Sequence, residues 1–215
     1  MTAQSGCQIY AVVEAGPGAL ERVEAALSAT DLAALLIIPA GDAPKMDPKA
    51  AEPLVQAAAR AGMAALVAAD AQLARILKAD GVHVRASKAV AEAYEEAREI
   101  VGPRAIVGAD PGLSRHDAMA LAEGGADYIA FGAPAHLNDR DKARARRDEL
   151  VAWWGEIFQI PCVVFDVETA DEAAALAAGG ADFIGVMLPS GQPPAAIRDA
   201  LAEIATAIRD AAMAS

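Results

Sequence analysis

Acidic side chains follow the ends of several short apolar segments of the sequence. These acidic residues are Glu14, Asp70, Asp110, Asp166 and Glu168. Carboxylates that converge on one site either bind a hard cation such as Mg²⁺ or raise one another's pKa. We expect Asp70 and Asp110 to be the metal ligands if a metal binds, and Glu14, Asp110, Asp166 and Glu168 to contact a substrate. The alternative is structural, because acidic residues at such positions also cap helices and form loop salt bridges.

Three basic or titratable side chains could transfer a proton or hold an anion. His136, in the loop after the sixth apolar segment, is the histidine best placed for acid–base work. Arg85 ends the fourth segment, where an arginine can clamp a phosphate or carboxylate, or equally pair with a nearby Asp. Lys142 lies in the charged stretch 137–149, which we expect to be a long loop running into a helix, either solvated or acting as a mobile lid. We predict catalytic roles for His136, Lys142 and Arg85.

His83 and the turn at Ser190 and Gly191 complete the candidate substrate contacts. His83 lies inside the fourth segment, so its side chain points opposite to those of Val82 and Val84. It is either a hydrogen-bonded core residue or a substrate contact. Ser190 and Gly191 precede the last predicted helix, where backbone N–H groups could hold an oxyanion. The acidic residues after the seventh segment would oppose such an anion unless a metal intervened.

The elements that must position these side chains alternate along the whole chain. Short runs that are apolar on both faces, as in strands buried between helices, are separated by longer alanine-rich helical runs. The predicted strands are 9–13, 34–38, 64–68, 81–84, 105–107, 128–131, 162–165 and 183–187. The predicted helices are 20–27, 50–61, 71–78, 88–100, 115–123, 144–158, 171–178 and 194–212. Ser87, Ser114 and Thr169 stand where helix N-caps are expected.

A repeat within the sequence supports this count of elements. The stretch 118–132 (AMALAEGGADYIAFG) recurs 55 residues later as 173–187 (AAALAAGGADFIGVM), and each copy reads as helix, glycine turn and strand. We therefore predict one domain over residues 1–215, a compact (β/α)8 TIM barrel with its active groups at the carboxyl ends of the strands. A doubly wound open sheet is the alternative. Its first strand would lead into a glycine-rich phosphate loop, and 15–19 (AGPGA) lacks the third glycine.

Charge and hydropathy restrict the partners. Lys and Arg number 18 against 30 Asp and Glu, a net charge of −12, and such a field repels nucleic acid. No uncharged apolar run reaches the roughly 20 residues of a membrane span, and no signal-peptide pattern is visible. We expect a cytoplasmic protein that meets neither nucleic acid nor membrane and binds a small molecule at the barrel mouth. The neighbours Trp153 and Trp154 leave a homo-oligomer open.

Six segments together resemble the thiamine phosphate synthase and thiazole tautomerase superfamily of small (β/α)8 barrels. They follow the family's order and spacing over nearly the whole chain: 9–14 (IYAVVE), 79–84 (ADGVHV), 105–110 (AIVGAD), 124–134 (GGADYIAFGAP), 160–165 (IPCVVF) and 179–187 (GGADFIGVM). The resemblance implies a TIM barrel. It also implies a transferase of thiamine biosynthesis that joins a pyrimidine pyrophosphate to a thiazole phosphate with Mg²⁺ and releases pyrophosphate.

The sequence departs from the family's pattern where phosphate and metal are held. The family's Gln-Leu-Arg-x-Lys after strand two is replaced by 36–40 (LIIPA), which has no base, and its Asn-Asp after strand three by 68–69 (AA), with Asp70 one residue late. The metal-binding Gly-Gln-x-Asp after strand four is replaced by 85–88 (RASK), and the phosphate loop Gly-Gly-Ile by 166–168 (DVE). Lys142 could replace the lysine of the family's sixth loop.

These losses remove most of the groups that would stabilise a pyrophosphate-releasing transition state. We therefore predict a thiamine phosphate synthase-like protein without the ordinary coupling activity, and expect Mg²⁺ only if the family's chemistry is retained. Two alternatives stay open. One is a non-catalytic barrel that binds a small neutral or cationic ligand, and the other is a different metal-dependent enzyme that uses the carboxylates at the mouth.

Overall fold

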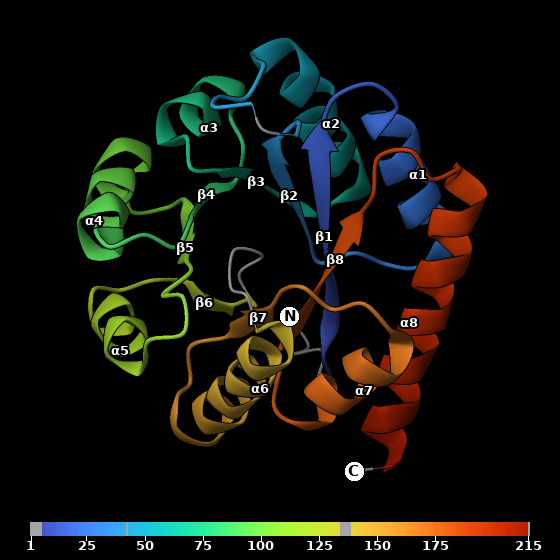
Figure 1. The fold of residues 1–215 in the computed structure, drawn as a ribbon. Coiled ribbons are helices and arrows are strands. Elements are labelled where there is room, and N and C mark those ends of the chain that lie inside the picture. Colours follow the sequence, from blue (N-terminus) through green and yellow to red (C-terminus); the bar gives the residue numbers. More distant parts are fainter. Residues whose placement is uncertain (1–5, 42, 134–138, 215) are drawn as a thin grey trace.

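The alternating strands and helices close into a barrel. The computed structural model describes residues 6–41, 43–133 and 139–214. The strands are all parallel and pair in chain order, and β1 pairs with both β2 and β8, so the sheet has no free edge. Figure 1 shows the helices surrounding the strands. The structure therefore confirms the predicted (β/α)8 TIM barrel.

The observed elements match the predicted ones closely. The strands are β1 (Gln8–Ala15), β2 (Ala34–Pro39), β3 (Ala64–Ala68), β4 (Gly81–Val84), β5 (Ile106–Ala109), β6 (Tyr128–Phe131), β7 (Cys162–Val164) and β8 (Phe183–Leu188). The helices are α1 (Ala19–Ala29), α2 (Pro48–Ala61), α3 (Ala71–Leu77), α4 (Val90–Val101), α5 (Arg115–Glu123), α6 (Arg140–Ile157), α7 (Ala170–Ala178) and α8 (Pro194–Ala214). No helix in these described ranges is long and apolar enough to cross a membrane.

Two predictions about helix starts are wrong. The helix predicted over 144–158 begins at Arg140, inside the charged stretch expected to be a loop that runs into a helix. The Asp139 side chain accepts the Lys142 backbone N–H at 3.0 Å, and the following residues favour a helix. Ser87 does not cap α4, whose N-cap position is Ala89; its Oγ instead accepts the Ala89 N–H at 3.3 Å in a local turn. Ser114 and Thr169 cap α5 and α7 as predicted.

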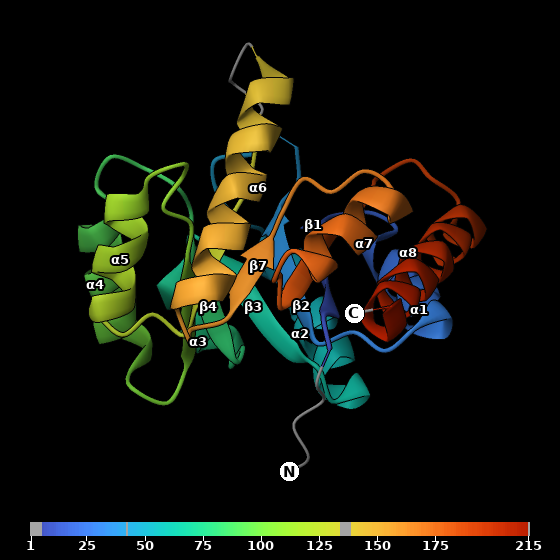
Figure 2. The same ribbon diagram turned by 90° about the horizontal axis from the view of Figure 1, so that it is seen from below.

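Figure 2 shows how far α6 extends. This helix of 18 residues rises beyond the barrel, and its first turn lies at the end where the strands terminate. Arginines from its first three turns therefore reach the loops that follow the strands, as described below.

Aromatic rings fill the inside of the barrel. Tyr10 from β1 and Tyr128 from β6 belong to an inner apolar cluster, with Phe165 packed against it. Glycines make room for two of these rings. A Cβ on Gly108 would stand 1.9 Å from Cζ of Tyr128, and one on Gly185 would stand 2.2 Å from Cδ1 of Phe165. Gly108 and Gly185 thus leave the space in which the rings of Tyr128 and Phe165 lie.

Candidate functional site

A cavity of about 410 Å³ opens at the carboxyl ends of the strands, the end where TIM barrels place their active groups. We call it the mouth cavity. Four polar residues predicted from the sequence line it: His83, Arg85, Asp110 and Asp166. The remaining wall consists of small and apolar residues: Val12, Leu36, Ile38, Ala68, Ala86, Gly132, Phe165, Val167, Gly185 and Met187.

Asp110 follows β5 and is half-buried at the edge of this cavity. Burial raises the pKa of its carboxyl to about 6, against the opposing effect of the Gly112 N–H, which donates to Oδ1 at 2.7 Å. The negative charge of Asp166 raises the pKa further. Asp110 can therefore exchange its proton near neutral pH, and its predicted contact with a substrate stays a prediction.

Asp166 follows β7 in a left-handed backbone conformation, with φ of 60°. Asp tolerates this conformation better than most residues. Its Oδ2 accepts the Ala133 N–H at 2.8 Å, which ties the loop after β7 to the end of β6. The carboxylate thereby lies against Gly132 and close to Asp110.

His83 points into the barrel from β4 and is buried. Its Nδ1 lies 3.0 Å from the Tyr128 hydroxyl, whose oxygen lies 2.8 Å from that of Tyr10. Burial lowers the pKa of His83 to about 3, helped by the charge of Arg85. His83 is therefore a neutral imidazole at physiological pH. It is a hydrogen-bonded core residue that also lines the mouth cavity, and its contact with a substrate stays a prediction.

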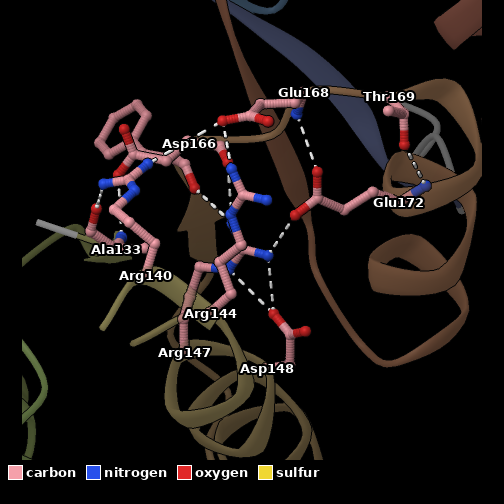
Figure 3. A network of polar contacts seen from close by, with 10 residues as sticks. Ala133, Arg140, Arg144, Arg147, Asp148, Asp166, Glu168, Thr169 and Glu172 are labelled. Atoms are coloured by element: carbon pink, nitrogen blue, oxygen red, sulfur yellow. Dashed lines mark hydrogen bonds and ion pairs between the residues drawn. The ribbon is translucent and has the colours of Figure 1, made fainter. Parts of the chain in front are cut away.

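Arginines from α6 converge on the loop after β7, as Figure 3 shows. Arg147 is fully buried and donates to the carbonyl oxygens of Phe165 and Asp166, both at 3.0 Å, and to Glu172 at 2.6 Å. Residues this buried and this well bonded fix the backbone on which Asp166 sits.

The other two arginines of this group meet Glu168. Arg144 donates to its carboxylate, and Arg140 lies 3.9 Å from the same oxygen and donates to the Ala133 carbonyl at 2.7 Å. Both cations are therefore already paired with groups of the protein itself.

The other predicted site residues lie elsewhere. Glu14 accepts the Gly41 N–H at 3.3 Å, and Lys142, Ser190 and Gly191 are exposed residues that do not line the mouth cavity. Glu168 is also outside the lining of the mouth cavity, and its carboxylate pairs with Arg140 and Arg144. His136 lies outside the described residues, so its predicted acid–base role stays a prediction.

The predicted metal ligands are engaged by the backbone. Asp70 caps α3 by accepting the Leu73 N–H at 2.8 Å, and Asp110 accepts the Gly112 N–H. Within the ranges that the structure describes, no group of three or more His, Cys, Asp or Glu residues is arranged to hold a metal ion. These residues therefore do not fit a Mg²⁺ ion, and no step of the function derived below uses one.

A second cavity, of about 630 Å³, opens at the amino ends of the strands. Ala34 and Ala64 are too small to close this end of the barrel, and Tyr10 and Tyr128 line the cavity. Active groups of TIM barrels lie at the opposite end, so the mouth cavity is the candidate site. Alanines at inward strand positions are the one feature of the sequence that could have indicated the second cavity.

Comparison with known proteins agrees with the fold and the strand-end motifs. A sequence model described as thiamine monophosphate synthase matches residues 9–189. The chain belongs to this family. It is 40% identical to the thiamine-phosphate synthase of Erythrobacter litoralis over 161 residues, 73% of this chain and 74% of that protein. It is 36% identical to that of Hyphomonas neptunium over 184 residues, 82% of each chain.

Solved structures confirm the barrel of this thiamine monophosphate synthase family member. A thiamine phosphate pyrophosphorylase from Pyrococcus furiosus superposes with a TM-score of 0.73 at 21% identity, over 95% of this chain and 96% of that one. A tryptophan synthase from Mycobacterium tuberculosis superposes with a TM-score of 0.70 at 16% identity, over 95% and 93%. The fold is thus shared by enzymes with different chemistry, while the sequence relatives make this chain a thiamine phosphate synthase-like protein.

Proposed function

We propose that this family member binds a small neutral or cationic organic ligand in the mouth cavity and does not catalyse the pyrophosphate-releasing coupling. The observation that carries the proposal is the pairing of Glu168 with Arg140 and Arg144. These arginines lie on α6 beside the loop after β7, and the Glu168 carboxylate already pairs with both, so its charge offsets one of their two positive charges. A phosphate would have to compete with Glu168 for them.

The charges that line the mouth cavity also argue against phosphate binding. Asp110 and Asp166 line it, and Arg85 is the cation among the described lining residues. With Asp110 ionised the lining carries more negative than positive charge, and with Asp110 protonated the two signs balance. A pyrophosphate group carries several negative charges and needs an excess of cations or a metal, so this lining disfavours it.

The walls suit an organic ligand. The volume of about 410 Å³ falls within the range of small-molecule sites, and most of the lining is apolar with a few polar groups. Burial against Leu36, Phe165 and Met187 would contribute most of the affinity, and the polar groups would orient the ligand. The proposed ligand therefore occupies the same site as the family's substrates, but it is neutral or cationic where they are anionic.

A coupling assay tests the catalytic half of the proposal. The purified protein is incubated with hydroxymethylpyrimidine pyrophosphate, thiazole phosphate and Mg²⁺, and thiamine phosphate is measured. The related enzyme of Erythrobacter litoralis, assayed in parallel, serves as the active control. We expect no product above background, and a turnover number comparable with that of the control would overturn the proposal.

A thermal-shift series tests the binding half. Thiamine and the unphosphorylated pyrimidine and thiazole alcohols are compared with their phosphate esters, each at the same concentration. We expect the unphosphorylated compounds to raise the melting temperature more than the esters. The variant Phe165→Ala should lose this shift, and Glu14→Gln, outside the cavity lining, should keep it. Larger shifts with the esters would contradict the proposal.

A further inference from the structure

We infer that His83 presents its Nε2–H as a fixed hydrogen-bond donor to the mouth cavity, and that Tyr128 and Tyr10 hold it in this tautomer. The part of the inference that concerns the ligand rests on the proposed function. The part that concerns the tautomer depends only on the barrel interior and is tested without any ligand.

Three buried side chains form a continuous hydrogen-bonded chain across the barrel. Tyr10, Tyr128 and His83 are only 3%, 6% and 4% exposed. The Tyr10 and Tyr128 hydroxyl oxygens are 2.8 Å apart, and Tyr128 Oη lies 3.0 Å from His83 Nδ1. Tyr10 and Tyr128 line the cavity at the amino ends of the strands, and His83 lines the mouth cavity. Because Nδ1 is turned to Tyr128, Nε2 is the ring nitrogen left for the mouth.

The number of hydroxyl protons decides which group donates in each of these hydrogen bonds. The Tyr128 hydroxyl has one proton and takes part in two hydrogen bonds, so it donates one and accepts the other. In the first arrangement Tyr10 donates to Tyr128, Tyr128 donates to Nδ1, and both hydroxyl protons are bonded. In the second, Nδ1–H donates to Tyr128 and Tyr128 donates to Tyr10. The Tyr10 proton then has no acceptor among the interactions of the described residues.

A buried donor without a protein partner is costly, and Tyr10 is 3% exposed although its side chain borders the cavity at the amino ends of the strands. The first arrangement bonds both hydroxyl protons within the protein and is therefore favoured. It leaves Nδ1 without a proton, and a neutral imidazole then carries its proton on Nε2. The imidazole is neutral because burial holds its pKa far below the ordinary value. The tautomer thus follows from how the two tyrosines satisfy their hydroxyl protons.

The neighbouring rings keep this chain in place. Phe165 packs edge-on against both His83 and Tyr10, with ring centroids 5.4 and 5.7 Å apart. Gly108 lets the Tyr128 ring lie against the backbone of β5. A flip of the His83 ring would exchange Nδ1 with Cδ2 and Nε2 with Cε1, and it would break the hydrogen bond to Tyr128. The ring therefore keeps Nδ1 toward Tyr128.

The inference narrows the ligand class of the proposed function. A fixed, uncharged N–H donor pairs with an acceptor such as a ring nitrogen or a carbonyl oxygen. It repels a ligand that offers only N–H or O–H donors at this point, because two donors would then face each other in a buried place. The mouth cavity therefore selects molecules with an unprotonated acceptor on the edge that meets His83.

Nitrogen NMR of the imidazole rings in the ligand-free protein tests the tautomer. The His83 signals are assigned by their loss in His83→Asn, since the chain also has His116 and His136. At pH 7 we expect Nε2 to show a protonated, pyrrole-type shift and Nδ1 a lone-pair, pyridine-type shift. The reverse pattern would overturn the inference.

Variants separate the tyrosines' effect from a general change in packing. Tyr128→Phe removes the donor to Nδ1 and should give a mixture of tautomers, whereas Tyr10→Phe should retain the Nε2–H form. Tyr94→Phe is the matched control, because Tyr94 is a buried tyrosine outside the barrel that donates to Gly124 O. An unchanged His83 pattern in Tyr128→Phe would overturn the role of Tyr128.

Two small probes test the selection of an acceptor. Pyridine carries a ring nitrogen and benzene does not, and both fit the volume of the mouth cavity. We expect pyridine, and not benzene, to shift the Nε2–H signal in the wild type. Equal effects, or no effect of either probe, would contradict the ligand part while leaving the tautomer result standing. Failure of the coupling or thermal-shift prediction would likewise leave the NMR result unaffected.

Discussion

The carboxylates of Asp110 and Asp166 lie against the same glycine. A Cβ built on Gly132 would stand 3.0 Å from Oδ2 of Asp166 and 4.0 Å from Oδ2 of Asp110. A side chain at this position would crowd the Asp166 carboxylate, whereas its distance from that of Asp110 is an ordinary contact. Burial is the main cause of the raised pKa of Asp110, and the negative charge of the nearby Asp166 raises it further.

Stability should therefore fall with rising pH because of Asp110. Its folded-state pKa is about 6, above the ordinary 3.8, so the folded state holds the proton more tightly than the unfolded chain. The resulting stabilisation is complete below pH 4 and is lost as the pH rises through 6. At 1.36 kcal/mol per pKa unit the change is roughly 3 kcal/mol.

The substitution Asp110→Asn should abolish this dependence. The free energy of unfolding in urea is measured at pH 4 and pH 7 for the wild type and the variant. Relative to the wild type, the variant should gain stability between these pH values by roughly 2 kcal/mol, somewhat less than the full change because the unfolded carboxyl is already partly ionised at pH 4. Asp210→Asn, an exposed change on α8, is the control and should follow the wild type. A variant that parallels the control would show that Asp110 is not the group responsible.

Releasing the arginines from Glu168 should create an anion site. In Glu168→Gln the guanidinium groups of Arg140 and Arg144 lose their protein counterion, so inorganic phosphate can take its place. We expect phosphate to raise the melting temperature of this variant and not of the wild type, measured at low ionic strength. Glu149→Gln is the matched control, because Glu149 pairs with Arg146 on the exposed side of the same helix. Equal phosphate response in all three proteins would contradict the argument.

The sequence was sufficient for the barrel and for part of the site. The length and position of the apolar runs predicted both ends of β3, β4 and β6 correctly, because short apolar runs between turns leave little choice of where a strand begins and ends. His83, Arg85, Asp110 and Asp166 come together as predicted, because each belongs to the end of a strand or follows it directly. Strand ends are the part of a TIM barrel whose position is set by topology.

Side-chain direction after a strand was not predictable in the same way. Ala69 takes a left-handed conformation, with φ of 56°, and turns the chain so that Asp70 caps α3. Glu14 turns to the Gly41 N–H of the loop after β2. The pairing of Glu168 with Arg140 depends on the first turn of α6, which lies before the predicted start of that helix at residue 144. These outcomes depend on loop dihedral angles and on contacts between distant segments, which the spacing of residue types does not encode.

The aromatic interior should not tolerate a methyl group on Gly108. In Gly108→Ala the new Cβ would stand 1.9 Å from Cζ of Tyr128, whose hydroxyl is fixed by Tyr10 and His83. We expect a loss of about 3 kcal/mol or more in urea unfolding, at the upper end of overpacking effects. Gly6→Ala, where no atom lies within 4 Å of the added carbon, should change stability by less than about 0.5 kcal/mol. Similar losses in both variants would show that the Tyr128 ring can move aside.

Arg147 should be the most costly charged side chain to remove from α6. It is fully buried, and Arg147→Met would leave two carbonyl oxygens and Glu172 without their donor. We expect a loss of roughly 3–5 kcal/mol at pH 7 by urea unfolding, as for other broken buried ion pairs. Arg146→Met, at an exposed ion pair on the same helix, should cost less than about 1 kcal/mol.

The pH dependence of the Arg147 effect identifies its partner. Burial alone would raise the pKa of Glu172, but hydrogen bonds from Arg147 and from the Glu168 N–H together hold it below the ordinary value. A depressed pKa contributes stability that is present above the unfolded value and lost as the pH falls through the folded one. The gap between the wild type and Arg147→Met should therefore narrow at acid pH, and adding Glu172→Gln to the variant should recover part of the loss at pH 7. A gap that stayed constant with pH, and a double variant no more stable than the single one, would assign the cost to the two carbonyl oxygens instead.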